Sequence, residues 1–211
     1  MEKSDIDYTV YLCTDRTCLG QKDFYETIRN AILGGCSVVQ LREKNIDTRE
    51  YIRIAEKVRE VTKGLSVPLI INDRVDVCLA VDADGVHLGQ EDMEVSTARK
   101  LLGEDKIIGC SAHNLEEAEA AWHQGADYLG VGAIFSTNTK QNTVDTSIDV
   151  LKEICNLVKL PVVAIGGIGE DNVGQLAEAN FKGIAVVAAI MAKEDSKLAA
   201  KRLRQLMGEI L

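Results

Sequence analysis

The fold is decided by Pro68-Leu-Ile-Ile-Asn-Asp73, which is followed after one short segment by Asp84-Gly-Val-His-Leu-Gly-Gln-Glu-Asp92. Residues 69–71 are an apolar run with two β-branched members, and a proline precedes them, which is typical of a buried strand. Residues 85–88 have the pattern of a second short strand. Because parallel strands are joined only through a crossover, we interpret residues 75–81 as a short helix between the two strands.

This β-α-β interpretation brings two carboxylates together. Asp73 ends the first strand and Asp92 follows the second, so neighbouring parallel strands would place both side chains at one rim. Carboxylate oxygens are ligands that Mg²⁺ prefers when it is shared with a substrate diphosphate. We therefore expect Asp73 and Asp92 to hold Mg²⁺. The alternative is that Asp73 caps the next helix and Asp92 lies in a polar loop.

Composition narrows the class of protein. The chain has 211 residues, no low-complexity run and no flexible linker, so we predict one domain over residues 1–211. The net charge of -9 argues against nucleic acid or an anionic membrane as a partner. A charged N-terminus and the lack of a long apolar stretch favour a soluble, cytoplasmic protein. The six cysteines show no metal-ligand spacing. We interpret them as small side chains buried in the protein, which would work in a reducing compartment.

The rest of the chain repeats the same alternation. Strand patterns occupy residues 8–13, 37–42, 69–71, 85–88, 106–110, 127–132, 161–165 and 183–187. Helical patterns occupy residues 23–33, 48–63, 75–81, 96–102, 114–124, 147–158, 171–179 and 193–207, with Thr48 and Asn114 as N-caps. Eight strand-helix units favour a closed (β/α)₈ TIM barrel over an open doubly wound sheet. Chemistry is then expected where the strands end.

Polar side chains gather at those strand ends. Gln40, Arg42 and Lys44 stand at alternate positions after the second strand, so we expect them to point to one side. Arg42 and Lys44 would hold phosphate oxygens. The other candidates at strand ends are Asn72, Gln90, Ser111 and His113. His87 lies inside a strand, and we interpret it as packed or hydrogen-bonded.

The loops after the last three strands suggest an anion site. Residues 135–140 form a polar loop that ends in Lys140. We expect this loop to be a lid. Gly167 follows the seventh strand, and residues 187–189 open the last helix. Barrels often build a phosphate cup from backbone N–H groups in their seventh and eighth loops. The alternative for Gly167 is a simple turn glycine.

Six motifs together resemble the thiamine phosphate synthase family over nearly the whole chain. They are Gln40-Leu-Arg-Glu-Lys44, Ile71-Asn-Asp-Arg74, Asp84 to Asp92, Gly109-Cys-Ser-Ala-His113, Asp127 to Gly132 with Thr137 to Lys140, and Val163-Ala-Ile-Gly-Gly-Ile168. The resemblance implies a transferase that joins hydroxymethylpyrimidine diphosphate to a thiazole phosphate with Mg²⁺ as cofactor. The partners would then be small phosphorylated molecules. Whether the chain forms a homo-oligomer is left open by the resemblance.

The resemblance also assigns roles to residues. It implies Lys140, Arg42, Lys44 and Ser111 as catalytic, and Asp73 and Asp92 as metal ligands. The substrate-binding residues that it implies are Gln40, Leu41, Arg42, Glu43, Lys44, Asn72, Ser111, Thr137, Asn138, Thr139, Lys140, Gly167, Val187 and Ala188.

Three positions depart from the family pattern. Ala133 and Ser136 replace common prolines, and Ala188 replaces a common serine, so one hydroxyl to the thiazole phosphate is missing. Two other functions stay open. A thiazole tautomerase would not need Asp73 and Asp92 as metal ligands, and a non-catalytic binding barrel would release no pyrophosphate.

Overall fold

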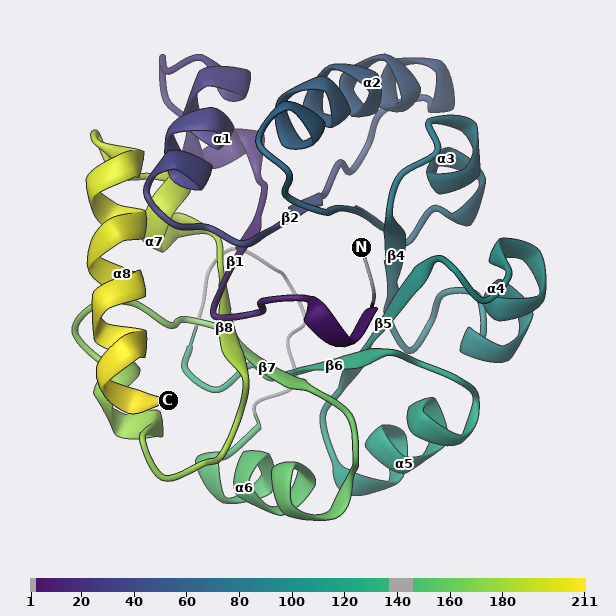
Figure 1. Ribbon diagram of the computed structural model, residues 1–211, viewed down its shortest axis with the longest axis vertical. Helices are drawn as coiled ribbons and strands as arrows, with labels where there is room; N and C mark the ends of the chain where they lie inside the picture. The colour runs from purple at the N-terminus through teal and green to yellow at the C-terminus, as the bar shows by residue number, and fades with distance from the viewer. Residues whose placement is uncertain (1–2, 137–145) are drawn as a thin grey trace.

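The computed structural model describes residues 3–136 and 146–211. Eight parallel strands pair in chain order, and β8 returns to β1, so the sheet closes into a barrel with helices around it (Figure 1). The strands are β1 Val10–Cys13, β2 Val38–Leu41, β3 Leu69–Asn72, β4 Gly85–Leu88, β5 Ile107–Ala112, β6 Tyr128–Val131, β7 Val162–Ile165 and β8 Gly183–Val186. The predicted (β/α)₈ fold class is therefore confirmed.

The helices cover the outside of the barrel. They are α1 Phe24–Leu33, α2 Thr48–Gly64, α3 Val75–Ala80, α4 Val95–Leu102, α5 Leu115–His123, α6 Ile148–Leu157, α7 Ala188–Met191 and α8 Ser196–Ile210. The described residues also form the short 3₁₀ helices η1 Lys3–Asp5, η2 Arg16–Cys18 and η3 Val173–Leu176. Across the described ranges, no helix combines the length and the apolar character that crossing a membrane requires.

Two apolar cores hold the barrel together. The larger one lies between the strands and the helices, and it includes Leu12, Leu41 and Leu129. The second fills the barrel interior with large side chains, among them Tyr11 and Tyr128, each about 1% exposed. This division follows from the strand period of two, since alternate residues point inward and outward. The interior is therefore a packed core, and a ligand can reach only the ends of the strands.

The N-terminal segment crosses the end of the barrel where the strands begin. In Figure 1, η1 lies in front of the centre of the ring of strands. Lys3 donates to Asp127, which precedes β6, with 3.0 Å between Nζ and Oδ1. Arg99 of α4 and the backbone N–H of Ile108 donate to the other oxygen of the same carboxylate. Asp127 thus ties the N-terminus, α4 and β5 together.

Three local predictions were wrong. The segment 171–179 is not a helix: it forms only the 3₁₀ turn η3, because the side chain of Asn172 bonds to the backbone of Gly167 and Gly169. The last helix does not open at Val187, because α7 is a separate four-residue helix before α8. The N-cap of α2 is Asp47 rather than Thr48, since the Asp47 carboxylate accepts from the Glu50 N–H.

Candidate active site

Asp73 and Asp92 lie at the end of the barrel where the strands finish. Asp73 directly follows β3 in a left-handed conformation with φ of 63°, and its N–H donates to the carbonyl oxygen of His87 at 2.8 Å. Asp92 follows β4, and its Oδ2 accepts from the Gly89 N–H at 2.7 Å. Backbone contacts therefore fix both aspartates at the mouth, as the β-α-β interpretation predicted.

The Asp92 carboxyl is influenced by burial and by the Asp73 carboxyl beside it. Burial raises the pKa of Asp92, and the adjoining Asp73 carboxyl raises this pKa further, against the smaller effects of the Gly89 N–H and Lys44. Lys44 forms an ion pair with Asp73. The alternative that Asp73 caps the next helix is wrong, because the N-cap of α3 is Arg74 and no side chain bonds to that helix end.

The chemistry of this pair fits a divalent cation. Two close carboxylates with a raised pKa on one of them indicate a place where added positive charge would be favourable. Within residues 3–136 and 146–211, no group of three or more His, Cys, Asp or Glu side chains could hold a metal. Mg²⁺ is commonly bound by one or two carboxylates while waters and substrate phosphates complete its shell, so Asp73 and Asp92 suit it.

The side chains of Gln40, at the end of β2, and of Arg42 and Lys44, after it, separate instead of pointing to one side. Gln40 points into the barrel and donates to the Tyr11 hydroxyl at 2.9 Å. Arg42 turns toward β1 and pairs with Asp15 at 3.3 Å, whereas Lys44 turns toward β3. The predicted alternation was wrong because β2 ends at Leu41, and the strand period does not continue into the loop.

Two further residues of this segment are turned away from the mouth. The Leu41 side chain is fully buried in the core between the barrel and the helices, so only its backbone could contact a substrate. The substrate-binding role that the resemblance implies for Leu41 would therefore use its backbone. Glu43 is also buried, and its Oε2 accepts from Arg16 at 2.8 Å. Its Oε1 has no hydrogen-bond partner among the described residues.

A chain of hydrogen bonds crosses the barrel interior and joins two predicted site residues. It runs from Gln40 through Tyr11, Tyr128 and His87 to Ser111. The Tyr11 and Tyr128 hydroxyls are 2.7 Å apart, the Tyr128 hydroxyl is 2.9 Å from His87 Nδ1, and His87 Nε2 is 3.0 Å from Ser111 Oγ. His87 is hydrogen-bonded, as predicted. The sequence analysis did not predict that the Tyr11 and Tyr128 hydroxyls form hydrogen bonds at the site.

Two glycines make room for this chain. A Cβ at Gly109 of β5 would lie 2.1 Å from Cζ of Tyr128, and a Cβ at Gly130 of β6 would lie 3.0 Å from Cε1 of His87. Glycine inside a strand often marks a place where another group approaches closely. Gly109 and Gly130 were therefore the sequence signal that could have revealed large side chains across these strands.

The other predicted residues at the strand ends lie close to this chain. Asn72 is the last residue of β3 and is mostly buried. Gln90 donates to the Ser111 carbonyl oxygen at 2.5 Å, which joins the loop after β4 to β5. His113 follows β5, and its Nδ1 lies 2.8 Å from Oε2 of Glu117 in α5. The mouth thus gathers Gln40, Asn72 and Ser111, while the His113 ring bonds to Glu117 of α5.

The loops after β6 and β7 are in close contact. The Phe135 N–H donates to the Gly166 carbonyl oxygen at 3.0 Å. Gly167 has a φ of 61°, and a Cβ there would lie 2.6 Å from the Ser136 carbonyl oxygen. The alternative of a simple turn glycine is therefore incomplete, because close packing also requires Gly167. Val187 directly follows β8, and Ala188 begins α7.

Thr137, Asn138, Thr139 and Lys140 lie outside the described residues. Their assigned roles, including that of Lys140, remain predictions from the resemblance.

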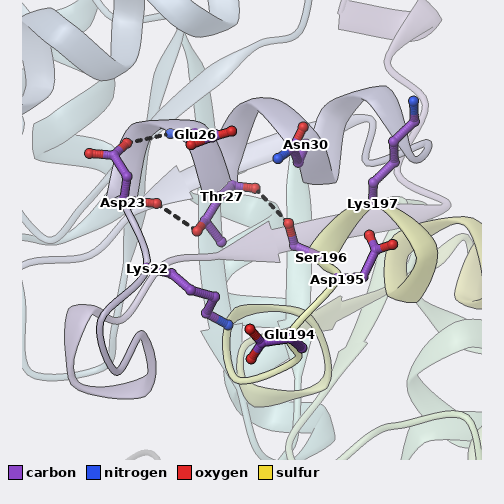
Figure 2. Close-up of a pocket in the computed structure, with 9 residues that line it drawn as sticks. All are labelled: Lys22, Asp23, Glu26, Thr27, Asn30, Glu194, Asp195, Ser196 and Lys197. Atoms are coloured by element: carbon purple, nitrogen blue, oxygen red, sulfur yellow. Dashed lines mark hydrogen bonds between the residues drawn. The ribbon is translucent and has the colours of Figure 1, made fainter.

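A surface groove of about 510 Å³ lies elsewhere, between α1 and the start of α8 (Figure 2). Its polar groups stabilise the two helices. The Asp23 carboxylate accepts from the Glu26 N–H at 2.7 Å, and the Ser196 hydroxyl donates to the Thr27 carbonyl oxygen at 3.3 Å. Because none of the predicted site residues lines this groove, it is separate from the mouth.

Comparison with known proteins gives a consistent result. The family model described as thiamine monophosphate synthase matches residues 10–190. A thiamine-phosphate synthase of Clostridium tetani is 50% identical, with 99% of this chain and 100% of that protein covered. One from Methanobrevibacter smithii is 46% identical, with 95% of each covered. The solved thiamine phosphate pyrophosphorylase of Pyrococcus furiosus has a TM-score of 0.89 at 41% identity, covering 98% of each chain.

The closed barrel and its mouth of carboxylates, cations and glycine turns define a (β/α)₈-barrel enzyme. The relatives are thiamine-phosphate synthases by name, and they match this chain over nearly its whole length. The chain belongs to the thiamine monophosphate synthase family.

Proposed function

We propose that this enzyme joins hydroxymethylpyrimidine diphosphate to a thiazole phosphate and releases thiamine phosphate and pyrophosphate. The observation that carries the proposal is the pair of carboxylates, Asp73 and Asp92, with Lys44 beside them at the barrel mouth. This arrangement suits a substrate that carries a diphosphate. The match to thiamine-phosphate synthases over nearly the full length of the relatives supports the same substrates.

The reaction replaces one bond by another at a methylene carbon. The carbon–oxygen bond to the diphosphate breaks, the pyrophosphate leaves with the electron pair, and the thiazole nitrogen forms the new carbon–nitrogen bond. An electron-rich aminopyrimidine stabilises the positive charge that develops on the methylene carbon. Charge separation is therefore the main barrier, and stabilisation of the departing pyrophosphate is what the protein must provide.

Arg42 and Lys44 would provide that stabilisation from the loop after β2. Arg42 offers a planar fork of donors and Lys44 a compact charge, and both lie beside acidic partners that keep them in place. Asp73 and Asp92 would hold Mg²⁺, which supplies further positive charge to the diphosphate when bound. Ser111 would donate to the pyrimidine diphosphate.

The second substrate would bind at the loops after β7 and β8. The backbone around Gly167, Val187 and Ala188 offers N–H groups to the thiazole phosphate, as in other barrels with a phosphate cup. Because Ala188 has no hydroxyl, backbone donors must make these contacts. No protein nucleophile is required, since the thiazole nitrogen attacks directly.

A single assay tests the proposal. Purified protein is mixed with both phosphorylated substrates, with Mg²⁺ or with a chelator, and pyrophosphate and thiamine phosphate are measured. We expect both products, and we expect the chelator to abolish them. Isomerisation of the thiazole without pyrophosphate would identify a tautomerase, and binding without any product would identify a non-catalytic barrel. Failure to form thiamine phosphate under every metal condition would contradict the proposal.

A further inference from the structure

The hydrogen-bond chain through the barrel interior has a direction. Gln40 donates its amide N–H to the Tyr11 hydroxyl. The Tyr11 hydroxyl has one proton, and the described residues that contact its oxygen are Gln40 and Tyr128. If Tyr128 donated to Tyr11, the Tyr11 proton would be buried without an acceptor, which is unfavourable in an apolar interior. Tyr11 therefore donates to Tyr128.

The direction continues to the far side of the barrel. Tyr128 has accepted from Tyr11, so its own proton goes to His87 Nδ1 at 2.9 Å. A ring nitrogen that accepts has no proton, and in the neutral imidazole the other nitrogen then holds it. His87 Nε2 therefore donates to Ser111 Oγ at 3.0 Å. The Ser111 proton has no acceptor among the described residues and is available to a ligand.

The packing shows that the chain is built into the barrel. Tyr11 and Tyr128 are each about 1% exposed, so water does not compete for their hydroxyls. Gly109 and Gly130 leave the space that the Tyr128 and His87 rings occupy. Burial also raises the pKa of Tyr128 far above its usual range, which keeps its proton in place.

We propose that Tyr11, Tyr128 and His87 are positioning residues. They make the Ser111 hydroxyl a donor and the side-chain amide oxygen of Gln40 (Oε1) an acceptor toward the pyrimidine substrate. The two ends are coupled, because a reversed Gln40 amide would reverse every donor in the chain. This inference rests on the proposed function, in which Gln40 and Ser111 contact the pyrimidine diphosphate.

The coupling predicts a preference for one class of pyrimidine. An acceptor at Gln40 is matched by an exocyclic amino group on the ring, and it repels the oxygen of a 4-oxo ring in the same place. A donor at Ser111 is matched by a phosphate oxygen or a ring nitrogen. A site built to pair a substrate N–H discriminates strongly against an analogue that lacks this group.

The first test reads the direction without any substrate. The chain has three histidines, so ¹⁵N-labelled imidazole resonances can be assigned by comparison with His123→Gln and His113→Gln. We expect His87 to be the Nε2–H tautomer in the unmodified protein. The Nδ1–H tautomer would show the reversed chain and overturn the inference. Because this measurement needs no turnover, it is independent of whether the proposed reaction occurs.

The second test breaks the chain at its centre. Tyr128→Phe removes one hydroxyl and keeps the ring, and the matched control is Tyr8→Phe. Tyr8 packs on Tyr128 with ring centroids 5.0 Å apart, but its hydroxyl is not part of the chain. In Tyr128→Phe, the Tyr11 hydroxyl is free to donate to the side-chain oxygen Oε1 of Gln40. The side-chain amide N–H of Gln40 can then face the ligand.

We expect Tyr128→Phe to shift the His87 resonances toward a mixture of tautomers. We also expect the ratio of kcat/KM between the amino and the 4-oxo pyrimidine diphosphate to fall about tenfold, as for one hydrogen bond of ordinary strength. The KM for the thiazole phosphate should not change, and Tyr8→Phe should keep both the tautomer and the ratio. An unchanged tautomer and an unchanged ratio in Tyr128→Phe would overturn the inference.

Discussion

Asp73 and Asp92 are held together although their charges repel. Asp73 is fixed by the His87 carbonyl oxygen and Asp92 by the Gly89 N–H, so neither can turn away without losing a backbone contact. The raised pKa of Asp92 is the cost of this arrangement. An unfavourable pair that the backbone keeps in place is typical of a functional site.

Replacing the two aspartates separately and together tests the shared-cation proposal. Asp73→Asn and Asp92→Asn keep the size of the side chain and remove its charge. Each should lower the rate about a hundredfold, by analogy with the loss of one preorganised charge-stabilising group. The double variant should lose much less than the product of the two, because the second carboxylate has no cation left to hold. Independent, multiplicative losses in kcat/KM would contradict a shared cation.

The same aspartate gives a prediction for stability. Because the pKa of Asp92 is higher in the folded than in the unfolded state, ionisation costs more in the folded state. This destabilisation is absent below the ordinary Asp pKa and is complete above the raised one. Asp92→Asn should therefore raise Tm at neutral pH in the presence of a chelator. Since the group is partly exposed, we expect at most about 4 °C.

Melting curves between about pH 3 and pH 7 check this prediction, because that range spans the ordinary Asp pKa. The difference between Asp92→Asn and the parent should disappear at the acidic end. Asp105→Asn is the control, since Asp105 is an exposed acid outside the mouth. A variant that melts lower than the parent at neutral pH would show that the Asp92 charge stabilises the fold.

At the scale of the elements, β5 and β6 depend on each other through Gly109. Alanine at this position would place its Cβ against the Tyr128 ring, and neither strand can move within a closed barrel. We expect Gly109→Ala to lower the free energy of unfolding by about 2–3 kcal/mol, as for overpacked cores. Denaturant unfolding of the variant and the parent measures this difference in the free energy of unfolding.

The matched control is Gly208→Ala in α8, where nothing lies within 4 Å of the added Cβ. This change should raise the free energy of unfolding by about 0.5–1 kcal/mol, because alanine favours a helix over glycine. If Gly109→Ala is as stable as the parent, the Tyr128 ring does not occupy the space above β5.

The strands were predictable because each is a buried apolar run, and their order around the barrel followed from the alternation with helices. The turn η3 was not predictable. The Asn172 side chain forms hydrogen bonds with the backbone of Gly167 and Gly169, and such a contact leaves no periodic pattern in the sequence. At the site, Asp73 and Asp92 were found from their places after two strands. Tyr11 and Tyr128 were missed because an inward tyrosine looks like any other large strand residue.

At the scale of the whole molecule, stability and activity lie at opposite ends of the barrel. Asp127 accepts from Lys3, Arg99 and the Ile108 N–H where the strands begin. We expect Asp127→Asn to lower the free energy of unfolding by about 2 kcal/mol, because contacts with a partly buried charge are lost. The kcat at 25 °C should not change.

Asp82→Asn is the control for this prediction. Asp82 also pairs with two cations, Arg59 and Lys106, but its side chain is 73% exposed. The loss should stay under about 1 kcal/mol, as for exposed ion pairs. Equal losses in the two variants would show that burial of Asp127 adds nothing.

Among the described residues, the filled interior and the N-terminal segment obstruct the end of the barrel where the strands begin, so substrates and products would use the other end (Figure 1). Two substrates must enter and two products must leave through the same mouth, where Gln40 is buried and Gly167 is exposed. We therefore expect ordered addition, with the pyrimidine diphosphate first. An unreactive thiazole phosphate analogue should then inhibit uncompetitively against the pyrimidine diphosphate. A noncompetitive pattern would show that either substrate can enter first, and that depth in the barrel does not set the sequence of events.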